Sequence, residues 1–263
     1  MKSFISILFG LFAMSEASFN KGYTANYIPK TTNISVGDSP DSWDWREHNI
    51  VGDIKDQGNC GSCWAFSAIG ALESQITKVT GESIILSEQE AVDCVKNIRS
   101  PDNSSVCCYG CNGGEMYSVY QYLINYNLSE DTEEEYPYEG IDQECVPVKS
   151  SDNTKLSRFV SLPANETIIK NALYHHGPIS IGVNANDDWQ EYNGGIYNPT
   201  EEECDSSIDH GVILVGYGSE KGLDYWIIRN SWGKDWGEHG YIRLVRGKNA
   251  CGVATTAIFP VLR

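Results

Sequence analysis

The sequence predicts an α+β protein in which a helical first part is followed by a β-rich second part. Apolar residues recur every three or four positions through residues 62–81, which is typical of a helix. After residue 156 the apolar segments become short, rich in Ile, Val and Tyr, and separated by turns that contain Gly and Asn. A chain of 263 residues can bury the core of one large or two modest units.

The first predicted helix begins near Ser62 and ends at Gly81. Its apolar repeat places Cys63 in the first turn. A second helix is expected over residues 87–95, because Ser87 and Glu90 have the spacing of a capping box. A third is expected over residues 114–125. The polar stretch 97–105, with Pro101, is expected to be a surface insertion.

The predicted strands cover residues 179–183, 211–215, 225–228 and 241–245, and we expect them to form an antiparallel unit. The folded part is expected to begin near Trp43, with a mainly helical lobe over 41–155 and a mainly β lobe over 156–263. Binding sites favour the cleft between two such units.

The composition excludes some partners. A formal net charge of -17 disfavours nucleic acids and anionic membrane surfaces, which need clustered Lys and Arg. No segment is expected to span a membrane. Nine cysteines indicate an oxidising compartment, and the odd count leaves at least one thiol unpaired within the chain. Four Asn-x-Ser/Thr sequons, at Asn33, Asn103, Asn127 and Asn165, support the secretory pathway.

The pair Cys60-x-x-Cys63 has three interpretations. A redox dithiol needs a βαβ context, but a polar loop precedes Cys60. A zinc site needs a second pair of ligands at regular spacing, and Cys107, Cys108 and Cys111 are irregularly spaced. The third interpretation is an activated nucleophile, since a helix N-terminus and a neighbouring imidazolium together lower a thiol pKa from about 8.5 to about 3–4.

His210 is the best candidate for that imidazole among the five histidines. It stands at the entry to an apolar strand, beside Gly211. A hairpin joining this strand to the next would bring Asn230 beside His210, where its carbonyl could orient the ring, and Trp232 could shield that hydrogen bond from water.

Residues 57–66 read QGNCGSCWAF. In the same order follow GCNGG at 110–114, DHG at 209–211, NSWG at 230–233, CG at 251–252 and FP at 259–260. These segments resemble the papain-like cysteine proteases, in particular the cathepsin L and papain branch, whose active-site cysteine lies in a Cys-Gly-Ser-Cys-Trp signature. The resemblance covers residues 41 to 263 and implies a two-lobed fold with the active site in the cleft.

The resemblance also implies roles. Cys63 would be the nucleophile, His210 its general base, and Asn230 the residue that orients His210. The side-chain amide of Gln57 and the backbone N–H of Cys63 would form the oxyanion hole. Substrate binding is expected from a set of residues that line the cleft, namely Gly113, Gly114, Met116, Gly182, Ile208, Asp209, Gly211, Trp232 and Thr256. The pocket that Met116, Gly182, Ile208, Gly211 and Thr256 would line carries no charge, so Leu or Phe is expected two residues before the scissile bond.

The family's pattern implies the disulfides Cys60–Cys111, Cys94–Cys145 and Cys204–Cys251. Cys107 and Cys108 depart from that pattern. They could pair with each other, remain thiols, or alter the pairing of their neighbours, which places Cys60–Cys111 in question.

Residues 1–17 resemble a signal peptide, and 18–40 a short leader. The run from Phe12 to Phe19 also resembles the end of an inhibitory prosegment, so a truncated prosegment is the alternative. We expect a monomer in an acidic vacuole or outside the cell, without metal or organic cofactor. Polypeptide substrates and cystatin-like or prosegment-like inhibitors are the expected partners. The competing functions are an exopeptidase, an inactive binding protein and a transglutaminase-like acyl transferase.

Overall fold

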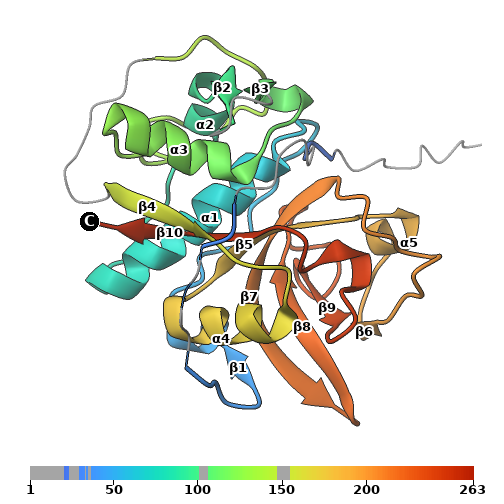
Figure 1. Cartoon of the computed structure of the whole chain (residues 1–263). Coiled ribbons are helices and arrows are strands. Elements are labelled where there is room, and N and C mark those ends of the chain that lie inside the picture. The colour runs from blue at the N-terminus through green and yellow to red at the C-terminus, as the bar shows by residue number, and fades with distance from the viewer. Residues whose placement is uncertain (1–20, 24–29, 33, 35–36, 101–105, 147–154) are drawn as a thin grey trace, which may run out of the picture.

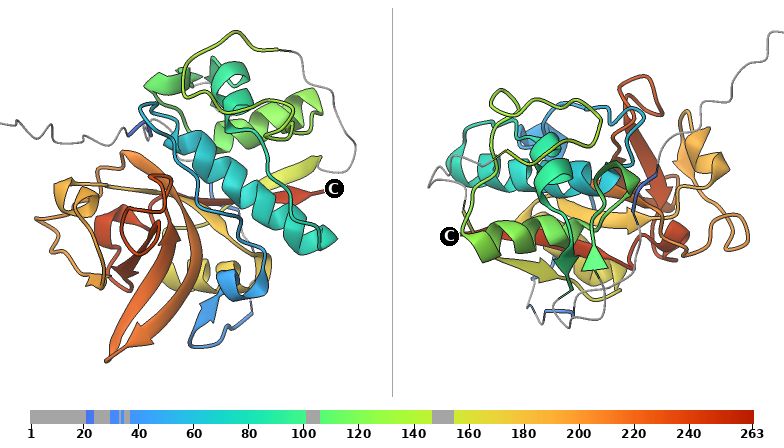
Figure 2. Two further views of the ribbon diagram at one scale, coloured as in Figure 1. Left: turned by 180° about the vertical axis from the view of Figure 1, so that it is seen from behind. Right: turned by 90° about the horizontal axis from the view of Figure 1, so that it is seen from above.

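The computed structural model describes residues 21–23, 30–32, 34, 37–100, 106–146 and 155–263 (Figure 1). The expected signal segment 1–17, the Asn33 and Asn103 sequons and much of the leader therefore lie outside the described residues. Figures 1 and 2 show two lobes. One lobe consists mainly of helices, and a twisted sheet forms most of the other.

The helical lobe contains the three predicted helices. They are α1 (Cys63–Thr80), α2 (Glu88–Cys94) and α3 (Met116–Tyr126). Gly81 ends α1 in the left-handed conformation, and the Ser87 hydroxyl caps α2 by accepting the Glu90 N–H at 2.9 Å. The short strands β2 (Ile98–Arg99) and β3 (Val106–Cys107) pair at the base of the predicted insertion, with the 3-10 turn η2 (Gly110–Asn112) after them.

The second lobe is built on a sheet whose described strands run in the order β4-β10-β5-β7-β8-β9-β6. These strands are β4 (Leu156–Ser161), β5 (Ile179–Val183), β6 (Ile196–Tyr197), β7 (His210–Glu220), β8 (Leu223–Arg229), β9 (Tyr241–Val245) and β10 (Ala257–Leu262). All the ladders along this order are antiparallel except β6 with β9. Helices α4 (Glu166–His176) and α5 (Asp187–Gln190) and the turn η4 (Ala250–Gly252) complete the lobe.

Residues 43–50 precede α1 in the sequence but belong to the sheet side. Strand β1 (Trp43–Asp44) pairs with Tyr217 and Gly216 of β7. The following turn η1 (Trp45–His48) buries Trp45, whose indole N–H donates to Leu173 O at 2.7 Å. The sequence-based division at residue 155 placed this segment with the helical lobe. Its position depends on pairing across about 170 residues, which local patterns do not report.

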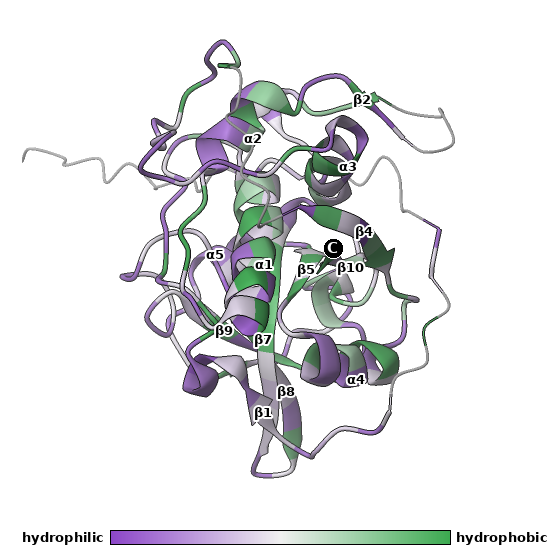
Figure 3. Cartoon of the chain, turned by 90° about the vertical axis from the view of Figure 1, so that its left-hand side faces the viewer, coloured by the Kyte–Doolittle hydropathy of each residue, from purple (hydrophilic) through white to green (hydrophobic). Residues whose placement is uncertain are grey.

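Helix α1 joins the two lobes. Every residue from Cys63 to Thr77 is buried, as expected of a helix covered on all sides. Figure 3 shows α1 in the middle of the molecule, between the α2–α3 region and the strands. Small side chains permit this close packing, because a Cβ added at Gly70 would lie 2.5 Å from Ile213 Cδ1 on β7.

A pair of buried carboxyl groups stabilises the helical lobe. Glu90 on α2 and Glu130 in the loop after α3 are 1% and 5% exposed, and their carboxyl groups interact with each other. The second oxygen of Glu90 accepts the Asp131 N–H at 2.6 Å. Burial raises the pKa of Glu90 to about 7. Burial and the Glu90 charge raise the pKa of Glu130 well above its usual range. Glu88, Asp131 and Glu135 add further negative charge nearby, so the pair retains a proton at acidic pH.

We predict that the free energy of unfolding falls as the pH rises toward neutral. In the unfolded chain a Glu carboxyl titrates near about 4.3. The raised pKa of about 7 means that the folded state binds more protons between these values. The stabilisation is complete below that window and is lost as the pH rises through it, by on the order of 2 kcal/mol. Urea unfolding between pH 4 and 8 measures this dependence. Glu90→Gln should reduce this dependence, to which Glu88 and Glu130 with their raised pKa values also contribute, whereas Glu134→Gln, at an exposed site, should leave it unchanged. An equal slope in wild type and Glu90→Gln would refute the prediction.

Candidate active site

Cys63 lies at the first position of α1. It is fully buried and is the one cysteine in the chain without a disulfide partner. Ser62 precedes it as the N-cap but provides no side-chain cap, so free N–H groups at this helix end surround the thiol. A helix N-terminus of this kind favours a thiolate over a thiol.

His210 begins β7, and Asn230 directly follows β8. The antiparallel ladder pairs Ile213 with Arg229, which brings the start of one strand beside the end of the other. His210 Nε2 lies 2.7 Å from Asn230 Oδ1, and the same oxygen accepts the Ser231 N–H at 2.9 Å. The Trp232 ring stacks on His210, with centroids 4.6 Å apart. The hydrogen bond fixes the ring orientation, and the indole excludes water from it.

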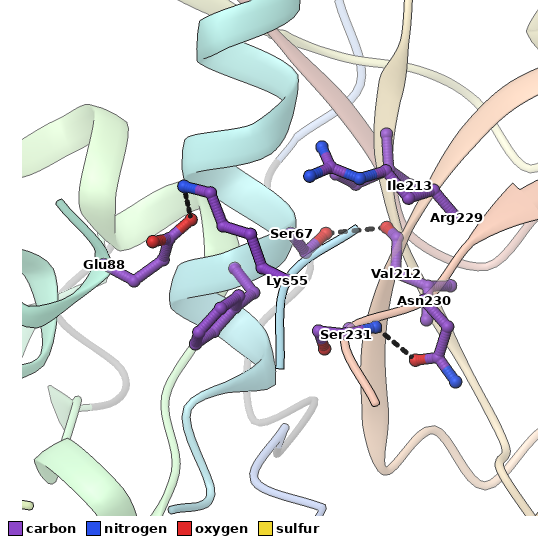
Figure 4. Close-up of a pocket in the computed structure, with 10 residues that line it drawn as sticks. Lys55, Ser67, Glu88, Val212, Ile213, Arg229, Asn230 and Ser231 are labelled. Carbon is purple, nitrogen blue, oxygen red and sulfur yellow. Dashed lines mark hydrogen bonds and ion pairs between the residues drawn. The ribbon is translucent and has the colours of Figure 1, made fainter. Parts of the chain in front are cut away.

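The N-terminus of α1 packs directly on the start of β7. A Cβ added at Gly211 would lie 3.0 Å from Cys63 O, and the Gly211 backbone N–H donates toward the Cys63 sulfur. One turn further along the helix, the Ser67 hydroxyl donates to Val212 O at 2.6 Å (Figure 4). These contacts hold Cys63 against Gly211, the residue that directly follows His210 on β7. Within the described residues, His210 Nδ1 is buried without a hydrogen-bond partner, so it is available to a thiol proton.

Gln57 lies in the loop before α1 and is fully buried. Its side-chain N–H₂ donates to Cys60 O at 2.9 Å, and its side-chain oxygen accepts the Ser231 hydroxyl at 2.7 Å. Its backbone N–H donates to Ser231 O at 2.9 Å. Gln57 therefore connects the loop before α1 with the segment that follows β8.

Residues 21–23, called here the leader contact, cover this site. The Gly22 N–H donates to the Cys63 sulfur at 3.3 Å. Gly22 O accepts the Gly114 N–H at 2.7 Å, and the Tyr23 N–H donates to Asp209 O at 3.1 Å. The Lys21 ammonium lies 2.8 Å from the Asp209 carboxylate. The leader contact thus occupies backbone groups that an extended peptide would need.

The expected substrate pocket contains the Tyr23 side chain. Tyr23 is 3% exposed, and its hydroxyl lies 3.5 Å from Thr256 Oγ1. A Cβ added at Gly182 would lie 3.0 Å from the Tyr23 ring and 2.6 Å from Ile208 Cγ2. Met116 belongs to the same apolar cluster. Gly113 and Gly114 lie at the opposite edge, where a Cβ would meet Gly22 O at 2.4 Å or the Trp64 ring at 2.5 Å.

In this covered arrangement burial favours the neutral form of both Cys63 and His210. Burial raises the pKa of the Cys63 thiol to about 11, although the N–H groups of Gly211 and Gly22 partly offset it. Burial also lowers the pKa of His210 to about 4, against the opposing effect of Asn230. The thiolate–imidazolium pair expected from the sequence therefore requires a change of environment. Removal of the leader contact would supply it, because it readmits solvent.

Four disulfides stabilise the fold. Cys60 pairs with Cys111, Cys94 with Cys145, and Cys204 with Cys251. Cys107 and Cys108, whose pairing the sequence left open, bond to each other. Cys60 therefore retains Cys111 as its partner, and this bond holds the loop before α1 against the GCNGG segment.

Within the described residues, no cluster of side chains has the composition of a metal site, and no helix has the length and apolar character to cross a membrane.

Two residues of the site carry no local sequence signal. Tyr23 lies in the leader, 40 residues before Cys63, and its place in the pocket depends on long-range contacts. The hydroxyl of Tyr138 lies 2.9 Å from Gln57 O, on a loop that sequence analysis did not connect with the site.

Comparison with known proteins agrees with this geometry. A family model described as "Papain family cysteine protease" matches residues 39–261. The chain is 45% identical to a cathepsin L from Sarcophaga peregrina over 90% of its length and 67% of the relative's. It is 46% identical to a cathepsin L-like protein from Caenorhabditis elegans, over 85% of its length and 64% of the relative's. The chain thus spans about two thirds of these curated relatives.

Solved structures agree as well. Digestive procathepsin L2 from Tenebrio molitor larval midgut superposes with a TM-score of 0.76 at 39% identity, over 88% of this chain and 70% of that chain. Bromelain from Ananas comosus, solved with a bound inhibitor, gives 0.76 at 34% identity, over 86% of this chain and all of that chain. The chain belongs to the papain family of cysteine proteases.

The leader contact yields a direct prediction. A Cβ on Gly22 would lie 1.8 Å from Gly61 O, so Gly22→Val cannot occupy the present position. We expect this variant to expose Cys63 and to raise its rate of alkylation by iodoacetamide at least about tenfold, since reaction then no longer waits for a local opening. Lys30→Ala, at an exposed leader position, serves as the control. Equal alkylation rates in Gly22→Val and wild type would contradict the proposed cover.

Proposed function

We propose that the chain is a cysteine endopeptidase that hydrolyses peptide bonds through an acyl-enzyme on Cys63. The observation that carries this proposal is the convergence of a lone helix-start thiol with an imidazole held 2.7 Å from an asparagine carbonyl oxygen. That combination contains a nucleophile, its base and the group that orients the base.

The reaction follows from the geometry. With the leader contact displaced, the Cys63 proton moves to His210, and Asn230 holds the resulting imidazolium in place. The thiolate attacks the substrate carbonyl carbon, and negative charge develops on the carbonyl oxygen. The Gln57 amide and the Cys63 N–H stabilise that charge, a contribution worth about 100- to 1000-fold in rate per donor. As the C–N bond breaks, His210 gives its proton to the leaving amine.

Hydrolysis completes the cycle. A water molecule gives a proton to His210 and adds to the thioester carbonyl, using the same oxyanion donors. The C–S bond then breaks, the peptide acid leaves, and the proton returns to Cys63 or remains on His210 as the ion pair. No metal or organic cofactor enters any step.

An open hollow beyond Trp232 supports cleavage within a chain. It is lined by the aromatic side chains Tyr192, Trp232 and Trp236, with Asp56 and Lys234 at the same hollow. A substrate extending past the scissile bond could occupy it. On the other side, Gly114 N–H and Asp209 O would bind the substrate backbone as they now bind the leader contact.

The pocket occupied by Tyr23 supports a preference for an apolar or aromatic substrate residue two before the scissile bond.

Four disulfides support the secretory pathway, with an acidic vacuole or the extracellular space as destination. Polypeptides would be the substrates. Protein inhibitors that lie in the cleft, of cystatin-like or prosegment-like type, would compete with them as residues 21–23 do.

Peptide hydrolysis tests this function. We predict that the Gly22→Val protein hydrolyses Leu-Arg and Phe-Arg amides at least about tenfold faster than Arg-Arg amides, as kcat/KM. The reason is that an Arg in this pocket would bury an unpaired charge. Cys63→Ala in the same background is the control and should show no turnover. Faster cleavage of Arg-Arg would overturn the specificity, and turnover in Cys63→Ala would overturn the mechanism.

A further inference from the structure

The Tyr138 hydroxyl contacts both segments that carry the proposed oxyanion donors. Its oxygen lies 2.9 Å from Gln57 O and 2.6 Å from Ser62 Oγ. Gln57 supplies the side-chain donor, and Ser62 is the residue directly before Cys63, which supplies the backbone donor. A single hydroxyl therefore bridges the loop before α1 and the first turn of α1.

The direction of these hydrogen bonds follows from the groups involved. A backbone carbonyl can only accept, so Tyr138 donates its one proton to Gln57 O. The Ser62 hydroxyl must then donate to the Tyr138 oxygen. Its alternative acceptor, Cys60 O, lies at 3.5 Å and is a weak partner. The two hydrogen bonds therefore run in one favourable direction, from the Ser62 hydroxyl to the Tyr138 oxygen and from the Tyr138 hydroxyl to Gln57 O.

The loop that carries Tyr138 is itself held firmly. The Gln89 side-chain oxygen accepts the N–H groups of Glu139 at 2.9 Å and Gly140 at 3.1 Å, and its amide donates to Ile141 O at 2.7 Å. The Tyr138 ring packs edge-on against Phe66 of α1, with centroids 4.9 Å apart. Helices α1 and α2 therefore both hold the hydroxyl in place.

We propose that Tyr138 is a positioning residue that sets the separation between the Gln57 amide and the Cys63 N–H. This inference rests on the proposed peptidase function. It assigns Tyr138 no contact with substrate. The two donors come from different segments. Within the described residues, the Tyr138 hydroxyl links these segments on the side of the helical lobe. Loss of the link would let the Gln57 loop shift relative to α1 without altering Cys63 or His210.

The test compares Tyr138→Phe with wild type, both carrying Gly22→Val. We expect kcat for peptide amides to fall about 5- to 30-fold, less than for complete loss of a donor, with KM within about twofold. The rate of Cys63 alkylation by iodoacetamide should not change, because that displacement develops no oxyanion. Tyr120→Phe is the matched control, since Tyr120 donates to Ala68 O of the same helix at 2.9 Å but lies away from Gln57.

A second measurement separates positioning from a general loss of structure. In a Gln57→Ala background, Tyr138→Phe should lower kcat by less than about twofold, because the donor that it positions is already absent. Equal losses in both backgrounds, or a parallel loss of alkylation, would overturn the proposal. So would wild-type kcat in Tyr138→Phe. If Cys63 in the Gly22→Val protein is alkylated but the protein hydrolyses no peptide, the proposed peptidase function is refuted, and the positioning role of Tyr138 is refuted with it.

Discussion

The contact between the first turn of α1 and the start of β7 is the constraint on which the site depends. Cys63 and His210 lie on different lobes and 147 positions apart, so no local structure brings them together. The close approach requires glycine at 211, where a Cβ would already lie 3.0 Å from Cys63 O. Ser67 stabilises this contact, called here the seam, by donating its hydroxyl to Val212 O at 2.6 Å. The Ser180 hydroxyl oxygen lies 2.7 Å from Ser67 Oγ.

Behind this seam, buried charges hold the lobes in register. Lys55 pairs with Glu73 at 2.8 Å and Glu88 at 2.6 Å, while Arg229 at the end of β8 reaches Glu73 and the Asp53 carbonyl. Figure 4 shows Lys55, Glu88 and Arg229 in the same region as Ser67 and Asn230. Because each buried charge has an opposite partner, breaking one would leave the other uncompensated. The buried pair Glu90–Glu130 makes the stability of the helical lobe depend on pH.

The sequence predicted the local elements well and the long-range ones less completely. The apolar repeat and Gly81 defined α1, and the strands 179–183 and 241–245 match β5 and β9. The hairpin that places Asn230 beside His210 also followed from strand pattern. Local patterns could not reveal that 43–50 pack on the sheet, that β6 pairs in parallel with β9, or that Tyr138 reaches Gln57. Each depends on contacts between distant segments. Burial favours the neutral forms of Cys63 and His210, an effect that the helix-dipole argument did not include.

In the proposed mechanism, His210 activates Cys63 once the leader contact is removed. The most direct test is the pH dependence of Cys63 alkylation by iodoacetamide in Gly22→Val, with and without His210→Ala. We expect the reactivity of Cys63 in Gly22→Val to persist to acidic pH, well below the ordinary thiol pKa of about 8.5, and His210→Ala to move the titration to alkaline pH. The same alkaline titration in both proteins would contradict it.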